Sequence, residues 1–348
     1  MKRFGVMVIG CGHIGTEHLT EIYYRSRVKI VAVVDELIER AHMAAVRFSS
    51  ENYGTDYRQY LNRDDIDIVI IATYANLHLP ILKDCLAAGK HVLCEKPIAS
   101  NEEDGAEFYD VVKASGCKVL VGHILRHNKS YQKIKELISG DAIGELRIMR
   151  MVQNHHTVDW KRYTKLLEDA SPVLDCGVHY IDIMEWLSGS EIIEVSGIGT
   201  RIDNDAPEDN YGLVTVKLSN SCVGYYESGW SPQIGSGNLK EFIGTKGRIT
   251  LEMQANRHDN REEGDLITLY RSESQTYESI NIQTKYKDMY RQLNVLMDMI
   301  ENGTPASPDM DEVYRAFRIA FIAQRAIKEG EKYGIASENI PHRQSAYI

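Results

Sequence analysis

A glycine turn near the start of the chain constrains its fold more than any other feature. The apolar run 4–9 leads into the spacing G-x-G-x-x-G, formed by Gly10, Gly12 and Gly15, and a stretch with helical spacing follows. In such a unit the first glycine allows a tight turn, and the second lets the backbone approach a pyrophosphate. The third lets the helix lie close to the strand. The helix N-terminus then offers N–H groups and positive dipole to the phosphates.

An acidic residue at the end of the second strand-like run completes this unit. The run 28–34 ends at Asp35, whose carboxylate suits the 2′-hydroxyl of a ribose and repels a 2′-phosphate. No basic residue follows it directly, and the first one is Arg40. The order strand, turn, helix, strand, acid favours a dinucleotide site over an ordinary glycine turn before a helix. We expect NAD to be preferred over NADP.

The first third of the chain alternates between strand and helix patterns. Its apolar runs lack polar alternation, as expected for a parallel sheet that is buried on both faces. Strands are expected at 5–9, 30–34, 68–72, 91–94 and 118–121, and helices at 14–24, 38–48, 79–88 and 102–115. The pattern predicts a doubly wound α/β domain over residues 1–123.

The pattern changes near residue 123 to strand-like runs separated by turn residues. Strands are expected at 146–153, 192–200, 212–218, 221–229, 240–244, 248–252 and 266–270, and helices at 131–138, 173–187, 289–301 and 310–329. A run of strands with one embedded helix predicts an α+β domain on a large, mostly antiparallel sheet. We assign it residues 124–348, of which 335–348 read as a tail.

Composition narrows the class of protein. The 348 residues suffice for two domains, and the net charge of −10 with interspersed acids and bases argues against nucleic acid or an anionic membrane as partner. The six cysteines form no C-x-x-C pair, which is typical of reduced thiols in a cytoplasmic protein. No apolar run approaches the roughly 20 residues of a membrane span.

A lysine follows the fourth predicted strand of the first domain. Glu95, Lys96 and Pro97 come directly after the strand 91–94, at the carboxyl edge of a parallel sheet, where ligands bind. Lys96 is therefore aimed at the same crevice as the glycine turn. A lysine there can hold a substrate hydroxyl and stabilise a developing alkoxide. The alternative is a solvated surface lysine.

The embedded helix of the second domain carries a polar stripe. Asp175, His179 and Asp182 are spaced i, i+4, i+7 on a helix that is otherwise largely apolar. A histidine beside a carboxylate is suited to general base catalysis. The alternatives are an N-capping role for Asp175, a hydrogen-bonded core histidine, and a metal site. No further ligand cluster stands out, so we predict no metal.

Weaker candidates lie elsewhere in the chain. The segment from Thr73 to His78 follows a predicted strand and can line a nucleotide site. Arg126, Asn154, His155 and His156 are candidates to face a polyhydroxy substrate, and Trp230 and Tyr286 to stack on a sugar.

These motifs resemble the Gfo/Idh/MocA family of NAD(P)-dependent oxidoreductases over nearly the whole chain. The resemblance rests on Gly10-Cys11-Gly12-His13-Ile14-Gly15, Ala72-Thr73 with His78, Glu95-Lys96-Pro97 and Asp175-x-Gly177-x-His179-x-x-Asp182. One departure is Tyr74, where many members have proline. The resemblance implies a Rossmann domain and a C-terminal α/β domain whose open sheet covers the active site and makes dimer or tetramer contacts.

The resemblance also implies site residues and an activity. The candidate cofactor residues are Gly10, Gly12, His13, Ile14, Gly15, Asp35, Thr73, His78, Glu95 and Lys96. The candidate substrate residues are Lys96, Arg126, Asn154, His155, Asp175 and His179, and the resemblance implies that Lys96, Asp175 and His179 are catalytic. The expected activity is hydride transfer from a secondary alcohol of a sugar, inositol or related polyol to NAD. The alternatives are an enzyme that recycles bound NAD, and a non-catalytic sensor of NAD and sugar.

Overall fold

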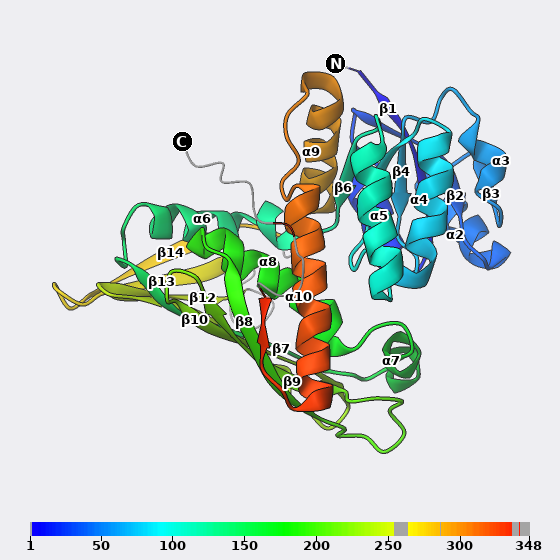
Figure 1. Ribbon diagram of the computed structural model, residues 1–348. Helices are drawn as coiled ribbons and strands as arrows, with labels where there is room; N and C mark the ends of the chain where they lie inside the picture. Colours follow the sequence, from blue (N-terminus) through cyan, green and yellow to red (C-terminus); the bar gives the residue numbers. More distant parts are fainter. Residues whose placement is uncertain (1, 254–263, 286, 336–340, 342–348) are drawn as a thin grey trace. The chain divides into compact units, whose positions relative to one another are not determined.

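The chain folds into two compact units (Figure 1). The structure is a computed structural model that describes residues 2–253, 264–285, 287–335 and 341. The first unit comprises Met1–Ile124 and Asp288–Met310, and the second comprises Leu125–Lys287 and Asp311–Ile348. None of the described helices is long and apolar enough to cross a membrane.

The first unit is the predicted doubly wound domain. Its strands are β1 (Phe4–Ile9), β2 (Val28–Val34), β3 (Asn52–Gly54), β4 (Ile68–Ile71), β5 (His91–Cys94) and β6 (Val119–Val121). Its helices are α1 (His13–Ile22), α2 (Ile38–Phe48), α3 (Arg58–Leu61), η1 (Ala75–Leu77), α4 (His78–Ala87), α5 (Glu102–Ala114) and α9 (Met289–Asn302), and η2 (Ile124–His127) spans the boundary. The strands pair in parallel in the order β3-β2-β1-β4-β5-β6, which confirms a Rossmann sheet.

This strand order locates the ligand crevice. The chain reverses its direction across the sheet between β1 and β4, which pair directly. In open α/β sheets ligands bind outside the carboxyl ends of the strands at this switch point. The loops that follow β1 and β4 are therefore the first place to look for cofactor contacts.

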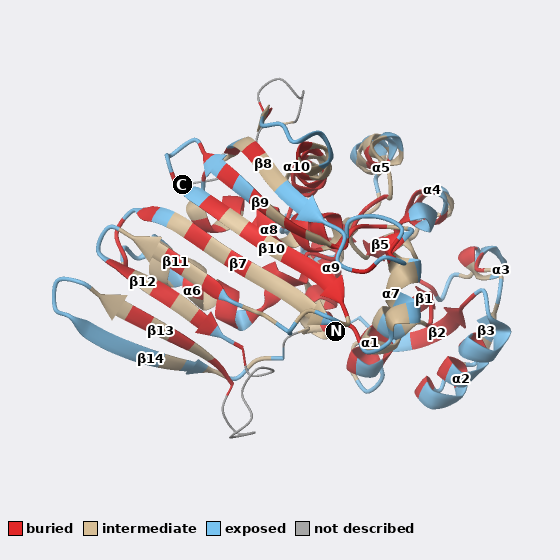
Figure 2. Cartoon of the chain, turned by 90° about the horizontal axis from the view of Figure 1, so that it is seen from below, coloured by how far each residue is buried: buried red, intermediate tan, exposed pale blue. Residues whose placement is uncertain are grey.

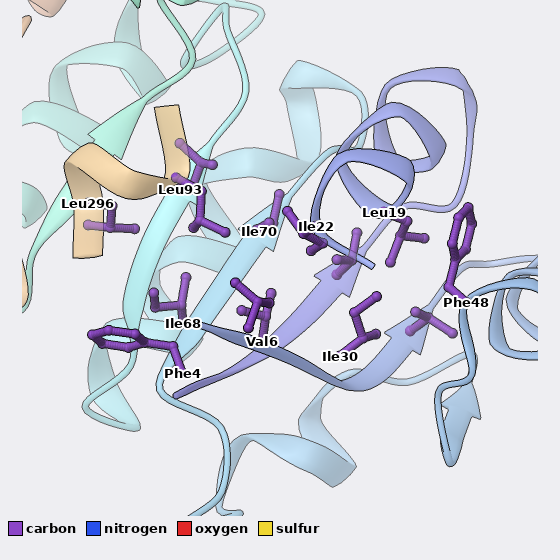
Figure 3. Close-up of a cluster of buried hydrophobic side chains, with 14 of the residues drawn as sticks. Phe4, Val6, Leu19, Ile22, Ile30, Phe48, Ile68, Ile70, Leu93 and Leu296 are labelled. Atoms are coloured by element: carbon purple, nitrogen blue, oxygen red, sulfur yellow. The ribbon is translucent and has the colours of Figure 1, made fainter. Parts of the chain in front are cut away.

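One helix that is distant in sequence completes the core of the first unit. Leu293, Leu296 and Met297 of α9 belong to the same buried cluster as Phe4 and Leu93 (Figure 3). The predicted boundary placed residues 289–301 in the second domain, and the structure corrects this assignment. An apolar helix face shows that a helix packs, but its sequence does not show against which unit.

This packing predicts a large effect at Leu296. Leu296→Ala leaves a cavity in the Rossmann core, so the free energy of unfolding should fall by about 2–5 kcal/mol. Urea unfolding monitored by circular dichroism measures it. Met43→Ala is the control, because Met43 is 63% exposed on α2 and its truncation should change stability by less than about 0.5 kcal/mol. Equal effects of the two substitutions would contradict the packing of α9.

The second unit is built on one large sheet. Its strands are β7 (Leu146–His156), β8 (Ile192–Thr200), β9 (Tyr211–Leu218), β10 (Val223–Ser231), β11 (Lys240–Gly244), β12 (Gly247–Glu252), β13 (Asp265–Arg271), β14 (Thr276–Ile282) and β15 (Tyr333–Gly334). Its helices are α6 (Lys129–Ser139), α7 (Trp160–Leu167), α8 (Pro172–Ser188) and α10 (Met310–Glu329). The order is β14-β13-β12-β11-β7-β10-β9-β8-β15, antiparallel except for the parallel pair β10–β7. This confirms the mostly antiparallel second sheet.

Strand β14 and helix α7 were not predicted from the sequence. β14 is an edge strand whose side chains are mostly exposed (Figure 2), so it lacks the alternation that marks a half-buried strand. α7 spans only 8 residues. That the sheet makes contacts between copies of the chain stays a prediction.

Helix α8 is seated closely on this sheet. The Ser171 hydroxyl accepts a hydrogen bond from the Leu174 N–H, and Pro172 occupies the first turn, so the start of the helix is fixed. A Cβ on Gly177 would lie 2.5 Å from the hydroxyl of Tyr226 on β10, and that hydroxyl donates to the Val173 carbonyl. Because Tyr226 is fully buried, only glycine fits at position 177.

Candidate functional site

The glycine turn after β1 has the geometry that a dinucleotide requires. Gly10 has a φ of +93°, and a Cβ on Gly15 would lie 1.7 Å from the Gly10 carbonyl oxygen, so neither position accepts a side chain. By contrast, nothing lies within 4 Å of the point where a Cβ on Gly12 would stand. Gly12 is also the N-cap of α1 and makes no side-chain capping bond. His13 and Ile14 follow in the first turn of the helix, and this open backbone fits a pyrophosphate.

Asp35 is held beside this turn. It is buried at the end of β2; its Oδ2 accepts from the Cys11 N–H at 2.8 Å, and its Oδ1 accepts from the Leu37 N–H at 3.0 Å. A carboxylate oxygen can accept more than one bond, so the fixed group still suits a ribose hydroxyl. Burial, followed by the charge of Asp35, raises the pKa of the Cys11 thiol to about 12. Cys11 is therefore a neutral thiol in the turn.

Cofactor preference can be tested at Asp35. Arg40 acts electrostatically on Cys11, so its charge reaches the same turn. Asp35→Ser removes the negative charge that repels a 2′-phosphate, and the ratio of kcat/KM for NADP to that for NAD should rise at least about tenfold. Steady-state kinetics with both cofactors measures it. Asp56→Ser, at a partly exposed position on the loop before α3, is the control. An unchanged ratio in Asp35→Ser would contradict the role of the Asp35 carboxylate.

The loop after β5 carries Lys96. Lys96 is half-buried, and the Lys96–Pro97 peptide is cis. Glu95 was predicted to contact cofactor, but its Oε1 lies 2.7 Å from Nε2 of His18, a fully buried residue of α1. A Cβ on Gly122 would lie 2.7 Å from the other carboxylate oxygen of Glu95. The structure therefore makes Glu95 an anchor for the Lys96 loop.

His78 has a similar role between two loops. It is 1% exposed, its Nδ1 lies 2.9 Å from the Pro97 carbonyl oxygen, and its Nε2 lies 3.2 Å from that of Thr73. It joins the loop after β4 to the loop after β5. His78 was predicted to contact cofactor, and in the structure it links these two loops. Thr73 stays the candidate for contact, because it is half-buried directly beyond β4.

Two residues of the predicted stripe, Asp175 and His179, are partly exposed in the structure. Nearly all of α8 is buried, whereas Asp175 and His179, one turn apart, are each half-buried. Both side chains are held by a rigid helix and reach its accessible stripe. This arrangement suits a base and its orienting carboxylate.

The third member of the stripe belongs to a different group. Asp182 is buried and forms a double hydrogen bond with Arg126, at 2.9 Å from Nε and 2.5 Å from Nη2. Nη1 of Arg126 donates to Glu312 at 2.7 Å. Burial alone would lower the pKa of the guanidinium, but the two carboxylates raise it. Arg126 was predicted to face substrate; at 4% exposed and with this many partners it is a structural residue instead.

The residues predicted on β7 divide between the two faces of the sheet. Gln153 accepts a bond from Tyr180 of α8, so Gln153 and His155 lie on the helix-covered face. Asn154 lies on the other face, where it donates to Glu227 at 2.5 Å. The prediction that Asn154 faces substrate is therefore corrected, whereas His155 keeps its candidacy. His156 is exposed, with Nδ1 3.2 Å from the Ile234 carbonyl oxygen.

Two further predictions concern aromatic and metal-binding residues. Trp230 is buried on β10, and Tyr286 lies outside the described residues. Within the described ranges no group of three or more histidine, cysteine, aspartate or glutamate side chains is placed to hold a metal ion.

A buried lysine beneath α8 was missed by the sequence reasoning. Lys240 of β11 is 1% exposed and donates to the Val152 carbonyl at 2.7 Å and to Asn238 Oδ1 at 2.5 Å. Its Nζ lies 4.9 Å from the ring centroid of Tyr180. The available signal was its position: Lys240 is two residues before the apolar Phe242 on the strand, so both side chains lie on the same, buried face.

From the burial of Lys240 we expect the free energy of unfolding to depend on pH. Burial lowers the pKa of Lys240 from 10.5 to about 7. Between these values the unfolded chain binds a proton that the folded chain lacks, so the folded state gains stability as pH rises. Relative to Lys240→Met, the wild-type free energy of unfolding should rise from pH 7 to 10 by up to about 1.4 kcal/mol per pH unit.

Urea unfolding at a series of pH values measures this difference. Lys217→Met, at an exposed position of β9, is the control and should differ from wild type by a constant amount. A difference for Lys240→Met that is equally constant would contradict the lowered pKa.

Comparison with known proteins identifies the family. Residues 4–123 match the model described as an oxidoreductase family with an NAD-binding Rossmann fold, and residues 131–250 match that of the GFO/IDH/MocA C-terminal domain. The chain therefore belongs to the Gfo/Idh/MocA family, and its first unit is an NAD-binding Rossmann domain. It is an NAD-dependent oxidoreductase.

Individual relatives agree in fold. The scyllo-inositol 2-dehydrogenase (NAD(+)) of Bacillus subtilis (strain 168) is 26% identical over 313 residues, which cover 87% of this chain and 88% of that protein. The structure of scyllo-inositol dehydrogenase from Lactobacillus casei with bound NAD(H) and scyllo-inositol is similar, with a TM-score of 0.78 and 22% identity, over 96% of this chain and 100% of that one. Aldose-aldose oxidoreductase from Caulobacter crescentus gives a TM-score of 0.84 at 19% identity, over 96% and 100%.

Proposed function

We propose that this protein oxidises a secondary alcohol of an inositol, a sugar or a related polyol with NAD. The observation that carries the proposal is the half-buried pair Asp175 and His179 on a largely buried helix, in a chain that also has an NAD-binding domain. Several relatives are named inositol 2-dehydrogenases, which supports the polyol class.

The residues divide the work of the reaction. NAD, when bound, accepts the hydride from the carbon that carries the hydroxyl. His179 removes the hydroxyl proton, and Asp175 orients the imidazole and stabilises its charged form. Lys96 donates to the hydroxyl oxygen and offsets its growing negative charge. The anchors at His18 and His78 keep the Lys96 loop in place, so the chain contributes position and electrostatics.

The test is NADH formation by the purified protein across a panel of inositols, aldoses, sugar acids and sugar amines. We expect at least one member to give NADH at 340 nm. No net NADH, together with nucleotide released on denaturation, would contradict a dehydrogenase and favour an enzyme that recycles its NAD. Failure of all substrates with NAD-dependent capture of a partner protein would favour a sensor.

The role of His179 has its own prediction. His179→Ala should lower kcat by at least about 100-fold, the usual scale for loss of a general base, with the KM for NAD nearly unchanged. His156→Ala is the control, because His156 is exposed and contacts a backbone carbonyl. A His179→Ala protein that turns over at a near-normal rate would refute the assignment.

A further inference from the structure

The helix-covered face of β10 carries buried polar groups that lack partners. Ser228 and Trp230 occupy successive inward positions of this strand, and both are buried. Within the described part of the chain, neither Oγ of Ser228 nor Nε1 of Trp230 has a hydrogen-bond partner. A buried donor without an acceptor destabilises the folded state. These atoms therefore point to a ligand that supplies the missing acceptor.

A directional chain of hydrogen bonds runs along the same face. The Tyr180 hydroxyl donates to Gln153 Oε1 at 2.5 Å, which leaves the amide Nε2 to donate to His155 Nε2 at 3.0 Å. A ring nitrogen that accepts carries no proton, so the proton of the neutral ring is on Nδ1. Nδ1 lies 3.4 Å from the hydroxyl oxygen of Tyr163 on α7. The chain thus fixes His155 as a neutral donor toward Tyr163.

Because His155 is the donor in this contact, the hydroxyl proton of Tyr163 points away from His155. Since its oxygen accepts from His155, the hydroxyl donates to a different group. Burial raises the pKa of Tyr163, so this group stays a protonated phenol. The rings of Tyr163 and Trp230 meet edge to face with centroids 5.5 Å apart. Two rings that each carry one donor, one from α7 and one from β10, are therefore neighbours.

Tyr163 and Trp230 lie on the same side of the sheet as α8, the helix that carries Asp175 and His179. The charge of Asp175 contributes to the raised pKa of Tyr163, so this carboxylate lies within electrostatic range of the ring. Trp230 is the register partner of His155 in the parallel pair of β7 and β10. Trp230 thus lies on the sheet face that α8 covers, with the ring of Tyr163 against it.

We propose that Tyr163 and Trp230 are specificity-determining residues that donate hydrogen bonds to one acceptor oxygen of the substrate. The inference rests on the proposed function, since that oxygen belongs to the polyol or sugar being oxidised. A hydroxyl and a carboxylate share this acceptor chemistry. A substrate that lacks the oxygen leaves the buried Trp230 N–H unsatisfied and is therefore discriminated against.

The experiment compares Trp230→Phe and Tyr163→Phe with wild type on the substrate found in the panel. Each variant keeps an aromatic ring and removes one donor. We expect the KM for substrate to rise about tenfold, which corresponds to about 1.4 kcal/mol, while the KM for NAD stays within twofold. Trp160→Phe is the matched control, because the Trp160 N–H already donates to Asp205 at 2.8 Å.

Substrate analogues that lack single oxygens identify the acceptor. One deoxy analogue should lose about tenfold in kcat/KM on wild type and nothing further on Trp230→Phe. If Trp230→Phe loses kcat/KM only with sugar acids, the acceptor is a carboxylate. If it loses kcat/KM with neutral polyols, the acceptor is a hydroxyl.

The outcomes separate the two proposals. If wild type turns over a polyol but both variants keep its KM within twofold, this inference fails and the proposed function stands. If no panel member reacts, calorimetry on the NADH-loaded protein measures binding instead. Weaker binding of a panel member to Trp230→Phe then supports the donor pair, whereas equal binding or none overturns it.

Discussion

The placement of α8 on the second sheet depends on the close contact between its Gly177 and Tyr226 of β10. This contact seats the helix on the sheet at a distance that no other residue allows. Most of the helix is buried, and Asp175 and His179 are among its few half-buried residues. The same seating brings Tyr180 into bonding distance of Gln153. One packing contact thus bears on where Asp175, His179 and Tyr180 lie.

The glycine turn of the first unit likewise depends on a close approach, here between backbone atoms. Gly10 and Gly15 let a strand and a helix meet so closely that Gly12 is left with open space above it. The polar residues around this turn mostly contact protein. His18 holds Glu95, and His78 joins two loops, so the position of Lys96 is set by buried partners. A site built on such support keeps its geometry before any ligand arrives.

The sequence predicted the elements whose side chains report on local packing. Buried strands, the glycine turn and the i, i+4 spacing of Asp175 and His179 are local patterns, and the structure contains them. The partners that a side chain meets in the folded protein are often distant in sequence. The wrong predictions concern residues whose role depends on such partners. Arg126 has the chemistry of a substrate ligand, yet it meets Asp182 and Glu312, which are distant in sequence. Asn154 and His155 are adjacent in sequence, but they lie on opposite faces because the strand alternates.

The most direct test of the account follows a hydride from the substrate carbon to NAD. The reacting polyol is deuterated at the carbon that carries the hydroxyl, and the NADH formed is analysed by mass spectrometry. The account predicts deuterium in the NADH made by wild type and at least about 100-fold less of it from Lys96→Met, which keeps the size of the side chain but not its charge. Deuterium that stays in the sugar product, or NADH formed equally by Lys96→Met, would contradict it.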